Sequence, residues 1–378
     1  MKSAVNIARV IVGILFIFSG LVKANDPLGL SYKMQEFFEL WGMAKFNSWT
    51  LLMSVLMNAF EIIAGFALLL GWRIKLFSWL LLLLIIFFTF LTGYAFLSGK
   101  FQNCGCFGDC LPITPKTSFI KDLLLLALIG FLFWKQNMIK PLLSDKTGTL
   151  SMLAVTILSF GFQWYTLSYL PVVDCLPFKK ENNITQKMKI PEGARPDSFA
   201  IRIVYEKAGK QYEFAPAELP SDLGTYKFVS RKDKLVKKGN AEPAIKGFSI
   251  SGVTDEDSTQ IVLSQSYAVL LFCEDFSVPV SKWEKEFANI YTTAKAKNIP
   301  VYMITTQSGE AAKKITGTSF AAIQVFKCDF TAIRTAARTN PCLYVLKQGE
   351  ILSKWSRHHF SSANKLIEGI TTQSAAPN

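Results

Sequence analysis

Five long apolar segments dominate the first half of the chain. They lie at about residues 5–23, 49–71, 77–98, 117–134 and 149–170. Each is close to the roughly 20 apolar residues that cross a hydrocarbon core of about 30 Å. From about residue 176, charged residues and short alternating patterns replace the long apolar runs. The pattern predicts a helical membrane domain over residues 1–175 and a polar region after it.

The polar region divides again near residue 246. Short alternating runs at 204–207 and 209–214 are joined by Ala-Gly, which is typical of a β-hairpin, and similar runs follow at 225–229 and 234–239. Residues 176–246 are therefore predicted to form a small β-rich connecting module. Residues 247–378 are predicted to form an α/β domain with helices on the faces of its sheet. The elements expected there are strands at 268–273, 301–305, 322–325, 342–346 and 351–355, and helices at 280–297, 310–315, 331–337 and 361–370.

Composition supports a membrane protein, because half of the residues are hydrophobic and the mean hydropathy is positive. The formal net charge is +13. No run of Lys and Arg interleaved with aromatic residues appears, so we expect no nucleic-acid partner. The positive charge is better explained by membrane anchoring and a solvated surface.

Lys and Arg in the short loops predict the orientation. They gather at the N-terminus, between the second and third spans and between the fourth and fifth spans: Lys2, Arg9, Arg73, Lys75, Lys135, Lys140 and Lys146. Placing these loops inside predicts a bacterial inner-membrane protein with its amino terminus inside and its carboxy-terminal domain in the periplasm. Residues 24–48 and the loop before the fourth span then share the outer face.

That loop, residues 102–110 and called the cysteine loop below, contains Cys104, Cys106 and Cys110. Thiols gathered at a membrane surface suggest redox or metal chemistry. A disulfide within Cys-x-Cys is strained, so Cys104 or Cys106 bonded to Cys110 is easier, and Cys175 beyond the fifth span is another candidate partner. A static disulfide, exchanging thiols and a metal site all remain open readings. The metal site is the least favoured of these readings and no metal ligand is assigned, because no His lies near and three sulfurs form an incomplete zinc shell.

Glu61 lies inside the second apolar segment, where a carboxylate is costly unless it is paired, protonated or facing a polar cavity. Asn58 lies three residues earlier, on the same helical face. Glu61 is therefore a candidate for relaying a proton or for hydrogen bonding a quinone carbonyl, and a packing contact is the alternative. Lys23 and Asp26, at the end of the first segment, are expected to form an ion pair at the membrane boundary.

Several of these residues resemble the DoxX/MauE family of small four-helix membrane proteins, specifically the Bacteroidetes type. The resemblance rests on Cys-Gly-Cys-Phe-Gly-Asp at 104–109, Ser-Phe-Ile-Lys-Asp at 118–122, Gly-Leu-Val-Lys at 20–23 and Asp-Pro at 26–27, and it covers about residues 1–135. It implies a compact bundle related in architecture to membrane thiol oxidoreductases. For the MauE branch it implies a role in disulfide formation during methylamine dehydrogenase maturation. The fifth span and the large outer domain depart from the four-helix pattern.

A second resemblance covers about the last third of the chain. Residues 270–283 resemble the first strand and active-site turn of thioredoxin-like proteins, and residues 340–346 resemble their cis-proline loop, with Pro341 as the proline. Aligned in this way, Ser277 and Val280 stand where the two cysteines of Cys-x-x-Cys would be. The domain therefore resembles a degenerate thioredoxin without its dithiol, because serine neither attacks as a thiolate nor resolves a mixed disulfide.

Taken together, these patterns predict a cell-envelope membrane protein that handles thiol–disulfide or respiratory-linked redox chemistry. Cys104, Cys106, Cys110 and Glu61 are the candidate catalytic residues, a quinone is the candidate cofactor, and the outer domain is expected to bind an envelope protein client. The alternative is a non-enzymatic assembly or scaffold protein whose loop disulfide is structural. The two readings differ in whether the loop cysteines change oxidation state during turnover.

Overall fold

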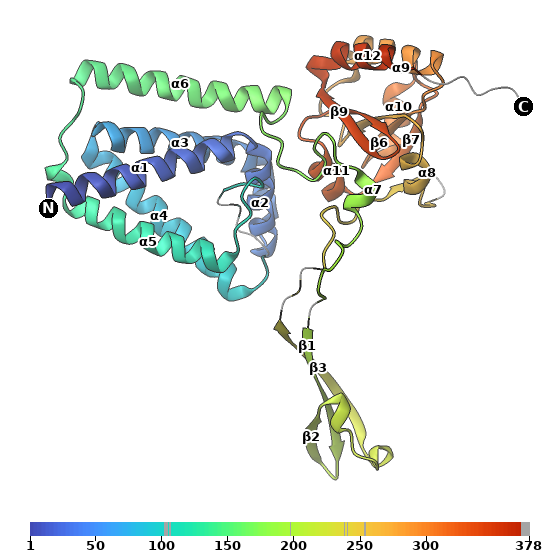
Figure 1. Cartoon of the computed structure of the whole chain (residues 1–378), viewed down its shortest axis with the longest axis horizontal. Coiled ribbons are helices and arrows are strands. Elements are labelled where there is room, and N and C mark those ends of the chain that lie inside the picture. The colour runs from blue at the N-terminus through green and yellow to red at the C-terminus, as the bar shows by residue number, and fades with distance from the viewer. Residues whose placement is uncertain are drawn as a thin grey trace, which may run out of the picture.

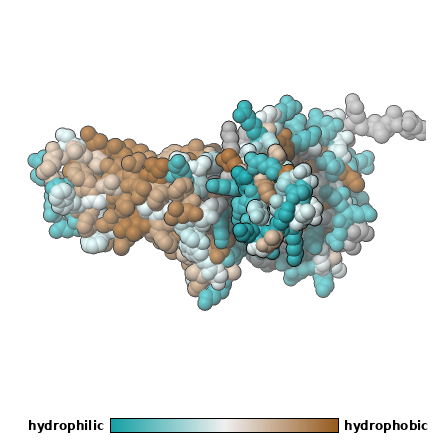
Figure 2. All heavy atoms as spheres, turned by 90° about the horizontal axis from the view of Figure 1, so that it is seen from below, coloured by the Kyte–Doolittle hydropathy of each residue, from teal (hydrophilic) through white to brown (hydrophobic). Residues whose placement is uncertain are grey.

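The computed structural model describes residues 1–101, 105, 107–196, 198–237, 239, 241–252 and 255–371. It contains a bundle of long helices, an α/β domain at one end of that bundle, and a separate three-stranded sheet (Figure 1). Figure 2 shows a broad hydrophobic surface over the helices and a hydrophilic surface over the outer domain. The predicted division into a membrane bundle and a polar region is therefore confirmed.

Five helices among the described residues are long and apolar enough to cross a membrane, which confirms the predicted spans. They are α1 (Lys2–Ala24), α3 (Thr50–Leu70), α4 (Ile74–Ser98), α5 (Pro115–Trp134) and α6 (Asp145–Tyr169). The helices place residues 24–48, residues 107–110 and the outer domain at the same end of the bundle (Figure 1). The protein is thus an integral membrane protein with residues 24–48 and its polar domain at one end of the bundle.

Helices α1 and α3 approach each other closely through glycines. A Cβ added at Gly20 would lie 2.7 Å from Ile62 Cγ1, and one added at Gly65 would lie 2.8 Å from the carbonyl oxygen of Gly13. Small residues allow this approach between spanning helices. The contact sets α1 and α3 in a register that brings Lys23 against Glu61.

A helix not expected from the sequence, α2 (Pro27–Leu40), lies across the outer end of the bundle (Figure 1). The Asp26 side chain accepts a hydrogen bond from the Gly29 N–H at 3.1 Å, and Pro27 occupies the first turn. A capping Asp followed by Pro is a strong helix start. Helix α2 forms the outer wall of the cavity described below.

The outer domain contains a six-stranded sheet in the order β4-β7-β6-β5-β8-β9. Strands β5, β6 and β7 are parallel, whereas β8 is antiparallel to β5 and β9 is antiparallel to β8. Buried clusters lie on both faces of the sheet. The bounds are β4 (Ile250–Ser251), β5 (Ala268–Cys273), β6 (Val301–Thr305), β7 (Gln324–Cys328), β8 (Cys342–Lys347) and β9 (Glu350–Ser356), with α7 (Ile184–Lys187), α8 (Thr259–Leu263), α9 (Glu284–Ala296), α10 (Ser308–Ile315), α11 (Phe330–Ala336) and α12 (Phe360–Gly369). The α/β class is confirmed.

Two details of the outer domain differ from the sequence-based expectation. Phe178 and Ile184, expected in the connecting module, are buried in the core beneath the sheet. The helix expected from Val280 begins instead at Glu284, after a single 3-10 turn over Val280–Lys282. Both differences depend on tertiary packing, which local patterns do not report.

The separate sheet has the order β2-β1-β3, with β1 at Ser198–Lys207, β2 at Lys210–Phe214 and β3 at Lys227–Lys237. The predicted hairpin is confirmed, and its turn residues Ala208 and Gly209 have φ values of 50° and 76°. The two further runs expected at 225–229 and 234–239 correspond to one continuous strand, β3, which pairs along β1.

Candidate functional site

The outer half of the bundle contains a buried ion pair. Lys23 Nζ of α1 donates a hydrogen bond to Glu61 Oε1 of α3, and the two side chains are 3% and 1% exposed. The sequence-based expectation that Lys23 pairs with Asp26 is wrong. Lys23 points into the bundle toward α3, whereas Asp26 caps α2 and pairs with the outer domain. The predicted site residue Glu61 is therefore paired, which is how a carboxylate is tolerated at this depth.

Asn58 is buried like Glu61 but contacts a different helix. Its side-chain amide donates to Gln163 Oε1 of α6 at 3.2 Å, and Gln163 donates to the Val55 carbonyl oxygen at 3.1 Å. Asn58 therefore helps to attach the fifth span to the bundle. Within the described residues, Glu61 Oε2 is buried and has no hydrogen-bond partner, so Glu61 keeps a free acceptor oxygen.

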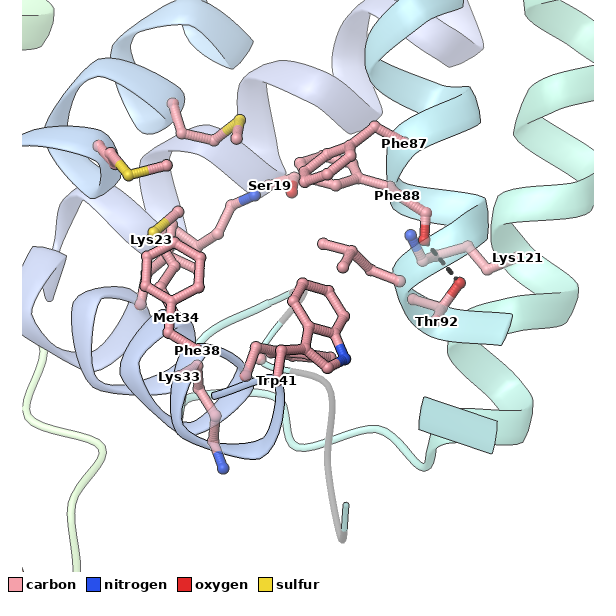
Figure 3. A pocket seen from close by; sticks show the side chains of 16 residues that line it. Ser19, Lys23, Lys33, Met34, Phe38, Trp41, Phe87, Phe88, Thr92 and Lys121 are labelled. Carbon is pink, nitrogen blue, oxygen red and sulfur yellow. Dashed lines mark hydrogen bonds between the residues drawn. The ribbon is translucent and has the colours of Figure 1, made fainter. Parts of the chain in front are cut away.

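A cavity of about 110 Å³ lies beside Lys23 at the outer end of the bundle (Figure 3). Its wall is mostly apolar and aromatic and comes from α2, α3 and α4: Leu30, Met34, Phe37, Phe38, Trp41, Met53, Met57, Phe87, Phe88 and Leu91. Its polar lining consists of Ser19, Lys23, Lys33, Thr92 and Lys121. Met53 and Phe87 are also exposed on the outside of the helices, so the wall of the cavity reaches the lipid-facing surface.

A second buried acid, Asp122 of α5, was missed as a site residue by sequence reasoning. Asp122 is fully buried, pairs with Lys121 and accepts a hydrogen bond from Thr92 Oγ1 at 2.9 Å. A smaller cavity of about 30 Å³ is lined by both Glu61 and Asp122. An aspartate beside an apolar helical run was the available signal, but only the packing shows that the two acids share a cavity.

Two described residues of the cysteine loop, Gly105 and Phe107, line these cavities. Cys104 and Cys106 lie outside the described residues, but Gly105 between them lines the larger cavity. Gly105 has a φ of +67°, and a Cβ there would lie 3.1 Å from Lys33 Cγ, so glycine suits both the backbone and the space. The ring of Phe107 lies 5.3 Å from Lys121 Nζ. Gly105 and Phe107 thus line the two cavities that also hold Lys23, Lys121, Glu61 and Asp122.

Cys110 forms a disulfide with Cys175, and the two Cα atoms are 4.8 Å apart. This is one of the pairings that the sequence left open, and it joins the cysteine loop to the segment that follows α6. Among the described residues, no group of three or more His, Cys, Asp or Glu side chains could hold a metal ion.

The outer domain is attached to the residues next to that disulfide. Arg338, which is 5% exposed, donates hydrogen bonds at 2.8 Å to both Asp26 and Asp109. Lys354 pairs with Asp174 at 2.6 Å. Burial lowers the pKa of Arg338, but the two carboxylates outweigh this and raise it overall. The residues before Cys110 and before Cys175 are therefore both ion-paired to the outer domain.

Arg334 of α11 extends this contact. Arg334 pairs with Glu274 at 2.7 Å and donates to Gln35 Oε1 of α2 at 2.6 Å. Its guanidinium lies 4.6 Å from the ring of Tyr32, whose pKa is raised mainly by burial. The contact between the outer domain and the bundle is therefore a network of charged and aromatic groups.

The predicted remnant site lies in the same part of the outer domain. Ser277 donates from its N–H and hydroxyl to Asp275 Oδ1 at 3.0 and 2.5 Å, in a loop before α9. Val280 packs against the buried cluster on one face of the six-stranded sheet. The Asn340–Pro341 peptide bond is cis. Asn340 donates to Asp275 Oδ1 at 2.6 Å, which joins the loops that carry Ser277 and Pro341.

The described thiols of the outer domain are buried in its core. Cys273, Cys328 and Cys342 are at most 5% exposed. Burial raises the pKa of Cys328 to about 12 and that of Cys342 to about 11, and it also raises the pKa of Cys273. Such thiols are poor nucleophiles near neutral pH.

Comparison with known proteins gives three partial matches. Residues 1–135 match the family model described as methylamine utilisation protein MauE. Residues 199–238 match a domain of unknown function, DUF8463. A stretch of 55 residues is 42% identical to Protein TlpB of Flavobacterium psychrophilum, covering 14% of this chain and 15% of that protein. No solved structure matches the chain.

Proposed function

We propose that this protein is a thiol–disulfide oxidoreductase of the bacterial inner membrane, with its amino terminus inside and its outer domain in the periplasm. The observation that carries the proposal is the place of the cysteine loop. Gly105 lines a cavity that also contains Lys23, and Lys23 is paired with the buried Glu61. The MauE match over residues 1–135 agrees with this reading.

The exchanging pair in this proposal is Cys104 and Cys106. Cys110 is bonded to Cys175, so it enters exchange only if that bond opens. A client thiolate attacks a Cys104–Cys106 disulfide and forms a mixed disulfide, and the second client thiol displaces the loop cysteine. The client gains a disulfide and the loop gains two thiols, so electrons and protons balance. A strained Cys-x-Cys disulfide suits an oxidising role.

A membrane quinone is the proposed oxidant, because it accepts the two electrons and two protons released when the loop thiols form their disulfide again. The cavity residues fit such a molecule. The walls are apolar and aromatic and reach the lipid side, while Ser19, Lys23 and Lys121 supply a few polar groups at one place. Binding sites for small amphipathic molecules have this composition. Lys23 and Lys121 would hold its oxygen atoms.

Glu61 and Asp122 are the proposed proton acceptors. Both are buried, and both line the smaller cavity beneath Phe107 of the cysteine loop. Glu61 Oε2 has no partner within the described residues, so it offers an acceptor for a proton. A carboxylate can accept a proton from a thiol at hydrogen-bond distance or through one water.

The outer domain is proposed to be a thioredoxin-like module that binds an envelope protein client. The parallel β6-β5 pair followed by the antiparallel β8 and β9 supports this reading. Ser277 and Val280 at the remnant site supply no dithiol, and the described core thiols are buried. The domain therefore binds and positions a client rather than reducing it.

A scaffold function is the second candidate, and one observation favours it. Asp109 and Asp174, the neighbours of Cys110 and Cys175, are both ion-paired to the outer domain. A disulfide held in this way stabilises the contact between the bundle and the outer domain without any exchange.

Differential alkylation with mass spectrometry on native membranes separates the two functions. The oxidation states of Cys104, Cys106, Cys110 and Cys175 are measured separately, with the respiratory chain running and then inhibited. The oxidoreductase proposal expects Cys104 and Cys106 to become reduced on inhibition while Cys110–Cys175 stays oxidised. States that do not change under either condition would leave the scaffold function as the conclusion.

A further inference from the structure

The three-stranded sheet of residues 198–237, called the sheet arm below, stands apart from both larger parts. Figure 1 shows it extending sideways from the outer domain, across the direction of the spanning helices and beyond the edge of the bundle. The bundle is embedded in the bilayer. The sheet arm therefore extends over the lipid surface that surrounds the bundle on the outer side.

One face of the sheet arm is aromatic. Residues paired across neighbouring strands share a face, and Tyr205 pairs with both Tyr212 and Phe228, while Ile203 pairs with Phe214. The ring centroids of Tyr205 and Phe228 are 5.9 Å apart. Tyr212 and Phe228 are 40% and 57% exposed. This face is an open apolar surface, which soluble proteins rarely leave uncovered.

The sheet arm is also basic. Residues 198–237 contain eight Lys and Arg and five Asp and Glu, so the net charge is 8 − 5 = +3. Lys210 lies beside the hairpin turn and pairs with Lys207 on the aromatic face, whereas Lys227 pairs with Glu206 and belongs to the opposite face. Neither has an ion-pair partner among the described residues. The surface therefore combines aromatic side chains with free positive charge.

We infer that the sheet arm lies on the outer surface of the bilayer, with its aromatic face in the headgroup region and its lysines against anionic phospholipid headgroups. Tyrosine and other amphipathic aromatic residues concentrate at membrane interfaces. Each Lys or Arg near an anionic surface adds to its attraction. The position beside the embedded bundle favours the lipid surface over a protein partner, because the arm is already held over the bilayer. This inference does not depend on thiol chemistry.

Photocrosslinking of the full chain tests this contact. Phe228 is replaced by p-benzoylphenylalanine, and the protein is reconstituted in nanodiscs of equal parts phosphatidylglycerol and phosphatidylcholine. The matched control carries the same probe at Lys232, which belongs to the opposite face. After illumination, mass spectrometry should find at least about five-fold more lipid adduct at position 228 than at 232, the ratio expected for one favourable interfacial contact. Equal yields, or adducts with protein instead of lipid, would overturn the inference.

Hydrogen exchange gives a second measurement that does not rely on the probe. Amides of β1, β2 and β3 should exchange more slowly in phosphatidylglycerol nanodiscs than in phosphatidylcholine nanodiscs. The Lys210→Gln variant should lose this difference while α12 exchanges as before, which shows that the chain is folded. Exchange rates in the sheet arm that are identical in the two lipids would count against the inference.

Discussion

The membrane bundle and the outer domain place their buried reactive groups in opposite surroundings. In the bundle, Glu61 and Asp122 are buried and paired with lysines, and both line a cavity that Phe107 also lines. In the outer domain, Cys273 and Cys342 are buried among apolar side chains that raise their pKa. Groups beside a cavity remain available to a ligand, whereas groups sealed in a core do not.

In the proposed function, this difference places the chemistry in the bundle and gives the outer domain a supporting role. Arg338 and Lys354 of the outer domain contact the carboxylates of Asp109 and Asp174, next to the disulfide, rather than the cavity. The outer domain therefore holds Asp109 and Asp174, the residues next to the disulfide, in place. Four predictions test this comparison, from the largest expected effect to the smallest.

The first prediction concerns the buried ion pair. Glu61→Gln leaves Lys23 without its charged partner, and we expect a loss of about 3–5 kcal/mol in the free energy of unfolding, because one buried charge remains uncompensated. Thermal unfolding in detergent measures the change. The control is Glu310→Gln in the exposed pair with Lys314, which should cost no more than about 1 kcal/mol. Equal costs for the two variants would show that the bundle does not depend on its internal charges.

The second prediction concerns the Cys110–Cys175 disulfide. The two cysteines are 65 residues apart, and closing a loop of that length contributes about 4 kcal/mol in the chain-entropy model. A Cys110→Ser/Cys175→Ser variant should unfold at a lower temperature, and reductant should have little further effect on it. Wild-type protein treated with reductant provides the comparison. A variant as stable as the oxidised wild type would contradict a structural role for this bond.

The third prediction concerns the attachment of the outer domain. Arg338→Gln removes the cation between Asp26 and Asp109, and we expect the contact to weaken by about 1.5–3 kcal/mol, the range for hydrogen bonds to charged groups. Amide exchange in α2 and α11 should become faster, whereas α12 should be unchanged. Arg231→Gln, which breaks an exposed Arg–Asp pair in β3, is the matched control and should leave α2 unaffected.

The fourth prediction concerns the core thiols. The pKa of Cys342 is raised from 9.0 to about 11 by burial, so at pH 8 only about one thiol in a thousand is ionised. Alkylation of Cys342 in the folded protein should be slow and should follow unfolding.

The same shift predicts the pH dependence of stability. The stabilisation from keeping this thiol neutral is fully present below pH 9, because neither state is then ionised. It is lost as the pH rises toward 11, since the unfolded thiol ionises first.

Rapid alkylation of native Cys342 at pH 8, at a rate close to that of the unfolded chain, would contradict its placement in the core.

Local patterns were enough to predict most elements of this chain. The spans follow from uninterrupted apolar length, and strands β5 and β6 lie at the predicted residues because buried parallel strands form short apolar runs. Helix α2 was missed because its apolar residues are interrupted by polar ones. The start of α9 was misplaced because Val280–Lys282 form a separate 3-10 turn before the helix.

The candidate site was only partly predictable, because local patterns identify unusual residues but not their partners in space. Glu61 stands out in the sequence because a carboxylate is rare in an apolar segment. Its partner was misassigned, since proximity along the chain favoured Lys23 with Asp26.

The sequence alone determined the membrane bundle, the α/β class of the outer domain, and the candidacy of Glu61 and the loop cysteines. These properties follow from apolar length, alternation and the cost of burying charge. Only the tertiary structure decided that Lys23 pairs with Glu61, that Asp122 shares its cavity, and that Arg338 joins Asp26 to Asp109. Each of these contacts joins residues far apart in the chain, and the packing of helices and domains, not local sequence, sets which side chains meet.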